Sequence, residues 1–131
     1  MTEETKASVT FADLPKLKDQ LDGGTFAGVI TLADGRHCAV VLLKDRPKMQ
    51  LTWQKAIDWA RSVGGQLVTP AIALLLHANC PDLLPQTWVW TDKPEGSSYA
   101  WHCNLYHGGV HCGGRSAEGG AVAVRLIPII T

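Results

Sequence analysis

Histidines and cysteines gather between residues 99 and 120, in the stretch YAWHCNLYHGGVHCGGRSAEGG. Three of the five histidines and two of the four cysteines lie there, beside a single acidic residue, Glu118. Imidazole and thiolate groups are usual ligands of zinc and copper, so a metal-binding or redox domain that uses His107, His111 and Cys112 is one hypothesis. Because their spacing matches neither a zinc knuckle nor a His-Glu-x-x-His helix, we keep the metal site as an alternative.

A ligand-binding surface is the main hypothesis for the same stretch. Residues 99–106 are expected to form a strand, in which side chains alternate between two faces. The more apolar set is expected to point inward: Tyr99, Trp101, Cys103 and Leu105. Ala100 belongs to the displayed set, and the predicted ligand-binding residues are His102, Asn104, Tyr106, His107, Val110, His111 and Arg115. Such residue types are typical of adaptable binding loops, and a solvated loop without a ligand is the plainer alternative.

We predict no catalytic residue and no cofactor, and therefore a protein that is not an enzyme. The sequence shows no Ser-His-Asp order, no paired-carboxylate site and no phosphate-binding loop. Residues 97–117 contain no carboxylate. This disfavours a calcium-dependent sugar site, since calcium requires several oxygen ligands.

Length and charge limit the classes of partner. With 131 residues the chain is expected to form one domain with a sizeable core. Lysine and arginine together number 12, as do aspartate and glutamate. The chain therefore has no excess positive charge that would favour nucleic acid as a partner. The polar N-terminal sequence and the short apolar runs predict neither a signal peptide nor membrane insertion. We therefore expect a soluble chain made in the cytoplasm, with free thiols rather than disulfides.

The N-terminal part is expected to hold a tail and a short helix. Residues 13–21 carry leucines at helical spacing after the cap-like Asp13, and a Gly-Gly pair that begins at Gly23 would end the helix. We therefore divide the chain into an N-terminal tail with a short helix, 1–24, and a domain, 25–131.

Local signals predict a hairpin followed by two helices. Residues 25–32 and 37–43 are apolar and β-branched, and the Asp-Gly pair within residues 33–36 is a strong turn signal. Apolar residues at helical spacing predict helices over 53–63 and 70–79, each preceded by a threonine that can cap it.

The C-terminal part is expected to be mainly extended. The predicted strands are 87–91, 99–106 and 121–130, with a glycine-rich loop over 108–120. The resulting fold class is α+β, with two main helices packed on small antiparallel sheets.

Four segments carry a resemblance that covers residues 26–127. They are LTWQKAIDWARSVGGQLVTPAIALLLHAN, WVWTD, SSYAWHCNLYHGG and AVAVRLI, in this order. Their order and spacing resemble a family of domains of unknown function from phages and bacteria, the Legionella-lectin C-terminal-like domains. The resemblance implies a C-type-lectin-like fold with a Gly-rich display loop. Val68 and Pro70 stand where the family typically has proline and arginine.

The same fold class includes the variable proteins of diversity-generating retroelements, in which a stretch before the last strand is mutated at adenines. The corresponding stretch here would be 102–116. The resemblance implies a phage or prophage variable or receptor-binding protein that recognises a protein or a cell-surface glycan. Virion association and homo-oligomerisation for avidity are further expectations, and a purely structural phage component is the remaining alternative.

Overall fold

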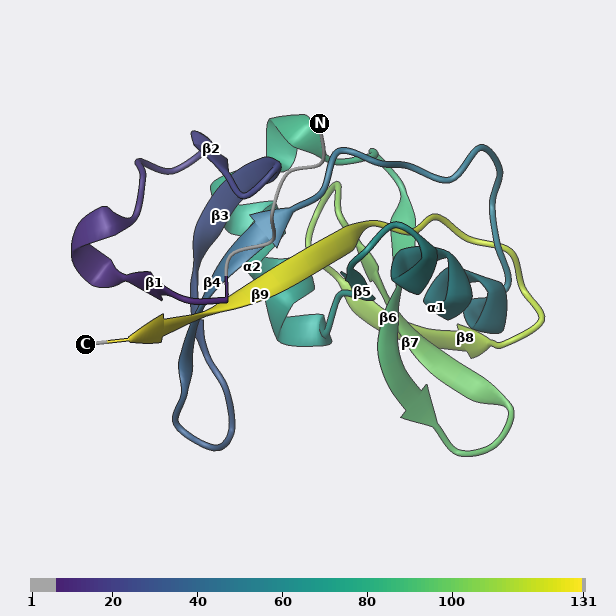
Figure 1. The fold of residues 1–131 in the computed structure, drawn as a ribbon. Helices are drawn as coiled ribbons and strands as arrows, with labels where there is room; N and C mark the ends of the chain where they lie inside the picture. Colours follow the sequence, from purple (N-terminus) through teal and green to yellow (C-terminus); the bar gives the residue numbers. More distant parts are fainter. Residues whose placement is uncertain (1–6, 131) are drawn as a thin grey trace.

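The computed structural model describes residues 7–130, which form two β-sheets with two α-helices packed against them (Figure 1). In chain order the elements are β1 (Val9–Thr10), the short 3₁₀ turn η1 (Phe11–Asp13), β2 (Gln20–Leu21), β3 (Gly24–Thr31), β4 (His37–Leu42), α1 (Trp53–Ser62), β5 (Gln66–Leu67), α2 (Pro70–Asn79), the 3₁₀ turn η2 (Pro81–Leu83), β6 (Trp88–Glu95), β7 (Tyr99–Asn104), β8 (Val110–Gly114) and β9 (Ala123–Ile130).

β9 is the strand that organises the first sheet. The strand order is β1-β9-β4-β3-β2, and β5 also pairs with β9. β9 runs parallel to β1 and antiparallel to β4 and β5. The last described strand therefore lies between β1 and the β3–β4 hairpin (Figure 1).

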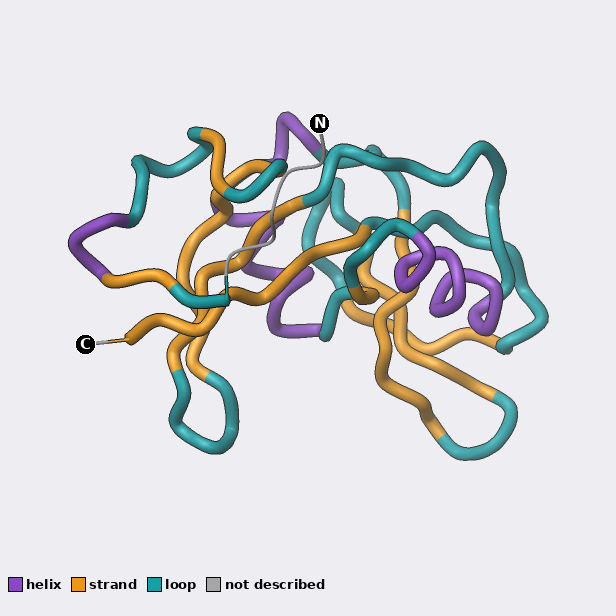
Figure 2. Tube along the Cα trace, viewed as in Figure 1, coloured by secondary structure: helices purple, strands orange, loops and turns teal. Residues whose placement is uncertain are grey.

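The second sheet has the order β6-β7-β8, with both pairs antiparallel. The chain between β8 and β9 connects it to the first sheet. There, Gly120 forms a bridge with Val89 of β6, and Gly119 forms a bridge with Leu51. Leu51 lies near the end of the long loop between β4 and α1, which Figure 2 shows as a loop segment across the molecule.

Two apolar clusters fill the core, and β6 contributes to both. Trp90 belongs to the cluster that contains Trp53 of α1, whereas its neighbour Val89 belongs to the cluster that contains Leu76 of α2. Neighbouring side chains of a strand point to opposite faces. Both faces of the second sheet are therefore covered near the start of β6 and the end of β7, where Cys103 is also fully buried.

The predicted α+β class, the hairpin and both helices are confirmed. β3 and β4 pair in antiparallel register around a turn in which Gly35 has a φ of +89°, a conformation that favours glycine. α2 spans the predicted range, and its N-terminus is capped by Thr69, whose Oγ1 accepts a hydrogen bond of 3.1 Å from the Ile72 N–H. The cysteines are free thiols, as predicted.

The predicted helix over residues 13–21 is wrong. The Lys18 N–H donates to the Phe26 carbonyl at 2.9 Å, and the Phe26 N–H donates to the Asp19 carbonyl at 2.8 Å. Apart from a turn in which the Asp19 N–H donates to the Lys16 carbonyl at 3.0 Å, the segment bonds to β3, and Leu21 is buried in the core. The predicted loose tail covers residues 1–9, of which 1–6 lie outside the described residues, and it is wrong at Val9, which begins β1 and pairs with β9.

The predicted loop over residues 108–120 is wrong in its first half, because β8 forms there and pairs with β7. β6 is also longer than predicted and extends to Glu95. Within residues 7–130 we find no helix with the length and apolar character needed to cross a membrane.

Candidate functional site

Five rings lie on the second sheet and its loop in two groups that meet at Gly109, and we name them the aromatic row: Trp88, His102 and His111, then His107 and Tyr106. The ring centroids of Trp88 and His102 are 4.4 Å apart, those of His102 and His111 are 6.1 Å apart, and those of His107 and Tyr106 are 6.2 Å apart. His102 and His111 are direct cross-strand partners, so their side chains share one face of the sheet.

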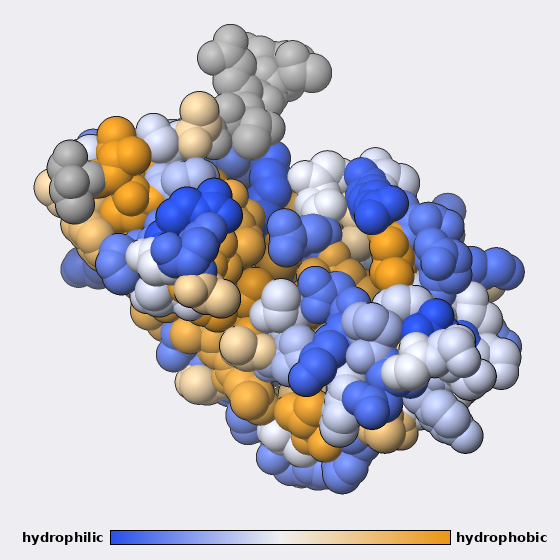
Figure 3. Space-filling model, turned by 90° about the horizontal axis from the view of Figure 1, so that it is seen from below, coloured by the Kyte–Doolittle hydropathy of each residue, from blue (hydrophilic) through white to orange (hydrophobic). Residues whose placement is uncertain are grey.

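Exposure increases along the aromatic row. Trp88 and His102 are half-buried, whereas His107, His111 and Tyr106 are exposed, with 65% of Tyr106 accessible. Figure 3 shows polar and intermediate hydropathy at the end of the molecule where Figure 1 places the β6–β7 turn, beside an apolar band over the middle of that face. The exposed rings of the row lie toward the opposite end of β7, where they offer ring faces and imidazole nitrogens to a ligand.

The buried end of the row rests on Trp90. The two indoles of Trp88 and Trp90 meet edge to face at 5.0 Å, and the Trp90 Nε1–H donates to the Leu51 carbonyl at 2.8 Å. Gly119 lies against the Trp88 ring so closely that a Cβ at residue 119 would collide with it. Glycine at this position is thus required for the position of Trp88.

The loop between β7 and β8 is held to α2. His77 Nδ1 lies 2.8 Å from the Leu105 carbonyl, within hydrogen-bonding distance. Within the loop, Asn104 Oδ1 accepts a hydrogen bond from the Tyr106 N–H at 2.9 Å, and the Gly108 N–H donates to the Asn104 carbonyl at 2.7 Å. These bonds fix the backbone beneath Tyr106 and His107 while their side chains stay exposed.

Of the seven predicted ligand-binding residues, four belong to the aromatic row: His102, Tyr106, His107 and His111. Asn104 lies beside the row and shapes the turn. Val110 pairs with Cys103 and packs against the cluster around α2, so it faces the other side of the sheet. The structure therefore does not bring Val110 together with the histidines.

Arg115 is engaged in the scaffold. Its guanidinium lies 4.4 Å from the ring centroid of Trp53 and donates from Nε to the Tyr99 carbonyl at 3.1 Å and from Nη2 to the Gly96 carbonyl. These contacts hold the β6–β7 turn and α1 together. Arg115 thus positions the second sheet, away from the imidazoles.

The predicted division of β7 into an inward and a displayed face is only partly right. Cys103 and Leu105 are buried as predicted, but Tyr99 is 53% exposed. Ala100, predicted to be displayed, is fully buried. The reason is that core clusters cover both faces of the sheet, so burial depends on the position along the strand as well as on the face.

The alternative metal site is not formed by the described residues. His111 and Cys112 are neighbours on β8 and point to opposite faces of the sheet, so they cannot bind one ion together with His107. Among residues 7–130, no group of three His, Cys, Asp or Glu side chains is placed to hold a metal ion.

His102 is the ring whose protonation the fold opposes. Its Nδ1 is buried without a hydrogen-bond partner among the described residues. Burial lowers the pKa of His102 below its usual value of 6.5, and the nearby His111 lowers the pKa further. His102 therefore favours its neutral form against Trp88.

Comparison with known proteins gives no further guide to this site. No family model matches the chain, and no curated protein matches it.

Trp88, Gly119 and His77 are the site residues that sequence reasoning missed. Trp88 alternates with Trp90 in the sequence, a pattern that predicted the strand but not its contact with the histidines. Gly119 and His77 gave no signal, because each acts on a residue far away in the chain.

We predict that Gly119→Ala destabilises the protein, by about 1–3 kcal/mol as for an overpacked core, because the added methyl group displaces the Trp88 ring. The matched control is Gly114→Ala, where an added Cβ meets no atom within 4 Å. Urea unfolding measures both variants. Equal free energies of unfolding for the two variants would contradict the role of Gly119.

We also predict that His102 makes stability depend on pH. Because its folded-state pKa lies below 6.5, the unfolded chain takes up the proton first as the pH falls. His102 thus lowers the free energy of unfolding progressively as the pH drops below that value. The variant His102→Phe keeps a ring on Trp88 and should lose less stability than the wild type between about pH 7 and about pH 5. An NMR titration midpoint of His102 above 6.5 would refute this account.

Proposed function

We propose that the protein is a non-enzymatic ligand-binding module and that the aromatic row is its binding surface. The observation that supports this proposal is the placement of four predicted residues, His102, Tyr106, His107 and His111, in one row that continues to Trp88. A binding surface gains affinity when its backbone is ordered before the ligand arrives, because ordering it on binding costs affinity. The fixed backbone beneath this row meets that requirement.

The chemistry of the row favours a ligand that packs against rings and exchanges hydrogen bonds with imidazole. Tyrosine and histidine supply flat contact area at low cost in side-chain entropy. The stretch from residue 97 to 117 has no carboxylate, so the surface has no oxygen cage for a divalent ion. We propose a protein or a cell-surface glycan as the ligand, recognised by shape, ring contact and hydrogen bonds without a metal or another cofactor.

For the fold we propose the C-type-lectin-like class. Two features support it: the order of a hairpin, two helices, a small antiparallel sheet and a last strand, and the pairing of that last strand with the hairpin. The proposed context is a phage or prophage, with the module associated with the virion and made oligomeric for avidity.

The display proposal predicts that replacing the exposed rings abolishes ligand binding. The combined variant Tyr106→Ala, His107→Ala and His111→Ala should bind an immobilised glycan panel or host cells at least about tenfold more weakly than the wild type. Stability should change little because these side chains are exposed. Tyr99→Ala is the matched control, since Tyr99 is 53% exposed and lies outside the row. Unchanged binding of the triple variant, or equal loss in the control, would refute the role of the row.

Diversification of residues 102–116 makes a separate genomic prediction. A reverse transcriptase and a near-copy of the end of this gene, differing at adenines, should lie beside the gene. Their absence would remove the diversification proposal and leave the binding proposal intact, because the two rest on different observations.

A further inference from the structure

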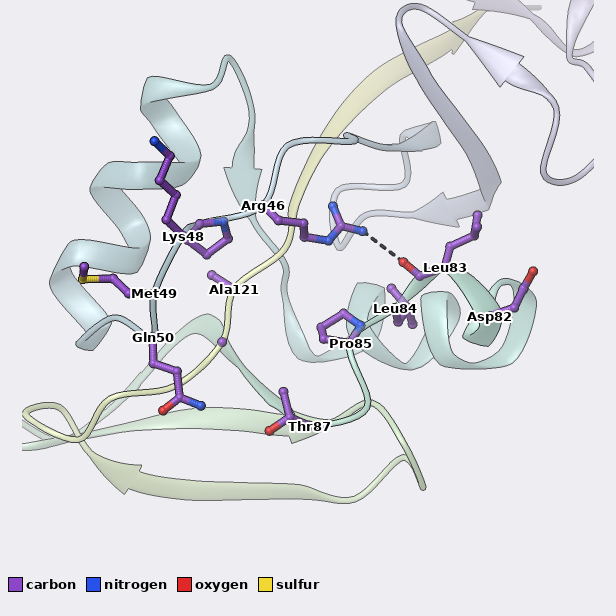
Figure 4. A pocket seen from close by; sticks show the side chains of 12 residues that line it. Arg46, Lys48, Met49, Gln50, Asp82, Leu83, Leu84, Pro85, Thr87 and Ala121 are labelled. Atoms are coloured by element: carbon purple, nitrogen blue, oxygen red, sulfur yellow. Dashed lines mark hydrogen bonds between the residues drawn. The ribbon is translucent and has the colours of Figure 1, made fainter.

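A second candidate site is a cavity of about 530 Å³ between the β4–α1 loop, the chain around η2 and the segment before β9 (Figure 4). Its volume is in the range of small-molecule sites. Thr87 and Gly120 border it, so it adjoins the chain segments that carry Trp88 and Gly119, but no ring of the aromatic row lines it.

The floor and walls of the cavity are largely apolar. Leu84 and Ala121 are buried at its base, and Pro47 and Pro85 form half-buried walls. Met49 lies at the rim with 71% of its surface exposed. A flexible thioether at the rim of an apolar pocket adapts to ligands of different shape.

Arg46 supplies a partly desolvated cation to this apolar space. Its Nη1 donates to the carbonyls of Leu43 at 2.7 Å and Asp45 at 2.9 Å, and its Nη2 donates to the Leu83 carbonyl at 3.1 Å, a bond that Figure 4 shows crossing toward η2. Burial lowers the pKa of Arg46, an effect that the nearby Asp45 opposes. The guanidinium stays charged even so.

Two N–H donors of Arg46 remain for a ligand. A guanidinium has five N–H groups, and three of them are used by these carbonyls. Among the described residues, Nε–H and the second N–H of Nη2 have no acceptor, and Arg46 forms no ion pair. Carboxylates are the preferred acceptors of such a fork.

The remaining charges at the cavity leave Arg46 as its main cation. Asp82 is the carboxylate of the lining, and Lys18 Nζ lies 2.8 Å from its Oδ1, so its charge is compensated. Lys48 also lines the cavity, but its side chain extends beside α1 and away from Arg46 (Figure 4). The cavity thus combines an apolar base with the guanidinium of Arg46.

We propose that this cavity binds a small organic carboxylate with an apolar body. The body packs on Leu84, Pro85 and Ala121, and the carboxylate accepts hydrogen bonds from Arg46. This site is independent of the aromatic row and goes beyond the proposed display function.

The experiment compares phenylbutyrate with its neutral amide, phenylbutyramide, by amide-resolved NMR titration of the wild-type protein. We expect the acid to bind with a Kd below about 1 mM and the amide at least about tenfold more weakly, with shifts centred on Leu84, Thr87 and Ala121. Equal affinity of acid and amide, shifts centred elsewhere, or no shift up to about 5 mM would overturn the proposal.

Variants separate the role of the Arg46 charge from an effect on folding. Arg46→Gln should weaken phenylbutyrate binding by at least about tenfold, whereas Lys48→Gln and Lys93→Gln, which remove cations directed away from Arg46 or far from the cavity, should leave it unchanged. Arg46→Gln also removes hydrogen bonds to three carbonyls, so the comparison of acid and amide on the wild-type protein keeps the test independent of folding. Tyr106→Ala should bind phenylbutyrate like the wild type, which distinguishes failure at this cavity from failure at the aromatic row. Equal binding by wild type and a folded Arg46→Gln variant would overturn the role of Arg46.

Discussion

The hydrogen bond from Trp90 Nε1 to the Leu51 carbonyl, 2.8 Å long, is the constraint on which both candidate sites depend. An indole N–H buried without an acceptor is costly, and Trp90 is fully buried. Leu51 in turn exchanges two backbone hydrogen bonds of 2.8 and 2.9 Å with Gly119. Because Trp88 packs over Gly119 and against Trp90, these residues hold the β4–α1 loop, the start of β6 and the segment before β9 together.

One consequence is that the aromatic row and the cavity, which differ in chemistry, lie on either side of the same chain segments. On one side, Trp88 carries His102 and the exposed imidazoles beyond it. On the other side, Thr87 and Gly120 form a wall of the cavity that Arg46 borders. The fold fixes the backbone of the β7–β8 loop beneath the row and the hydrogen-bonded part of Arg46 at the cavity, which removes part of the entropic cost of binding. The row remains neutral at its buried end because the fold disfavours protonation of His102.

Elements with strong local signals were predictable from the sequence. The Asp-Gly turn and the threonine before Pro70 define the hairpin and α2 by short-range chemistry. Residues 13–21 carried an equally regular leucine pattern, yet they bond to β3, because tertiary contacts there outweigh a helix of that length. β8 escaped prediction because its glycines have no strand propensity, and the strand forms only where β7 provides a partner.

In the candidate site, too, the sequence predicts residue types but not the contacts between residues that are far apart in the chain. Sequence reasoning identified the stretch and four rings of the row, since their types are visible in the sequence. It also grouped Arg115 with them, although the guanidinium is held by Tyr99, Gly96 and Trp53. A stretch that varies while its fold persists must keep such engaged side chains and change only those without scaffold contacts. Tyr106, His107 and His111 meet that condition on this protein, whereas Arg115 does not, so variation across residues 102–116 is physically tolerable only if it is unevenly distributed.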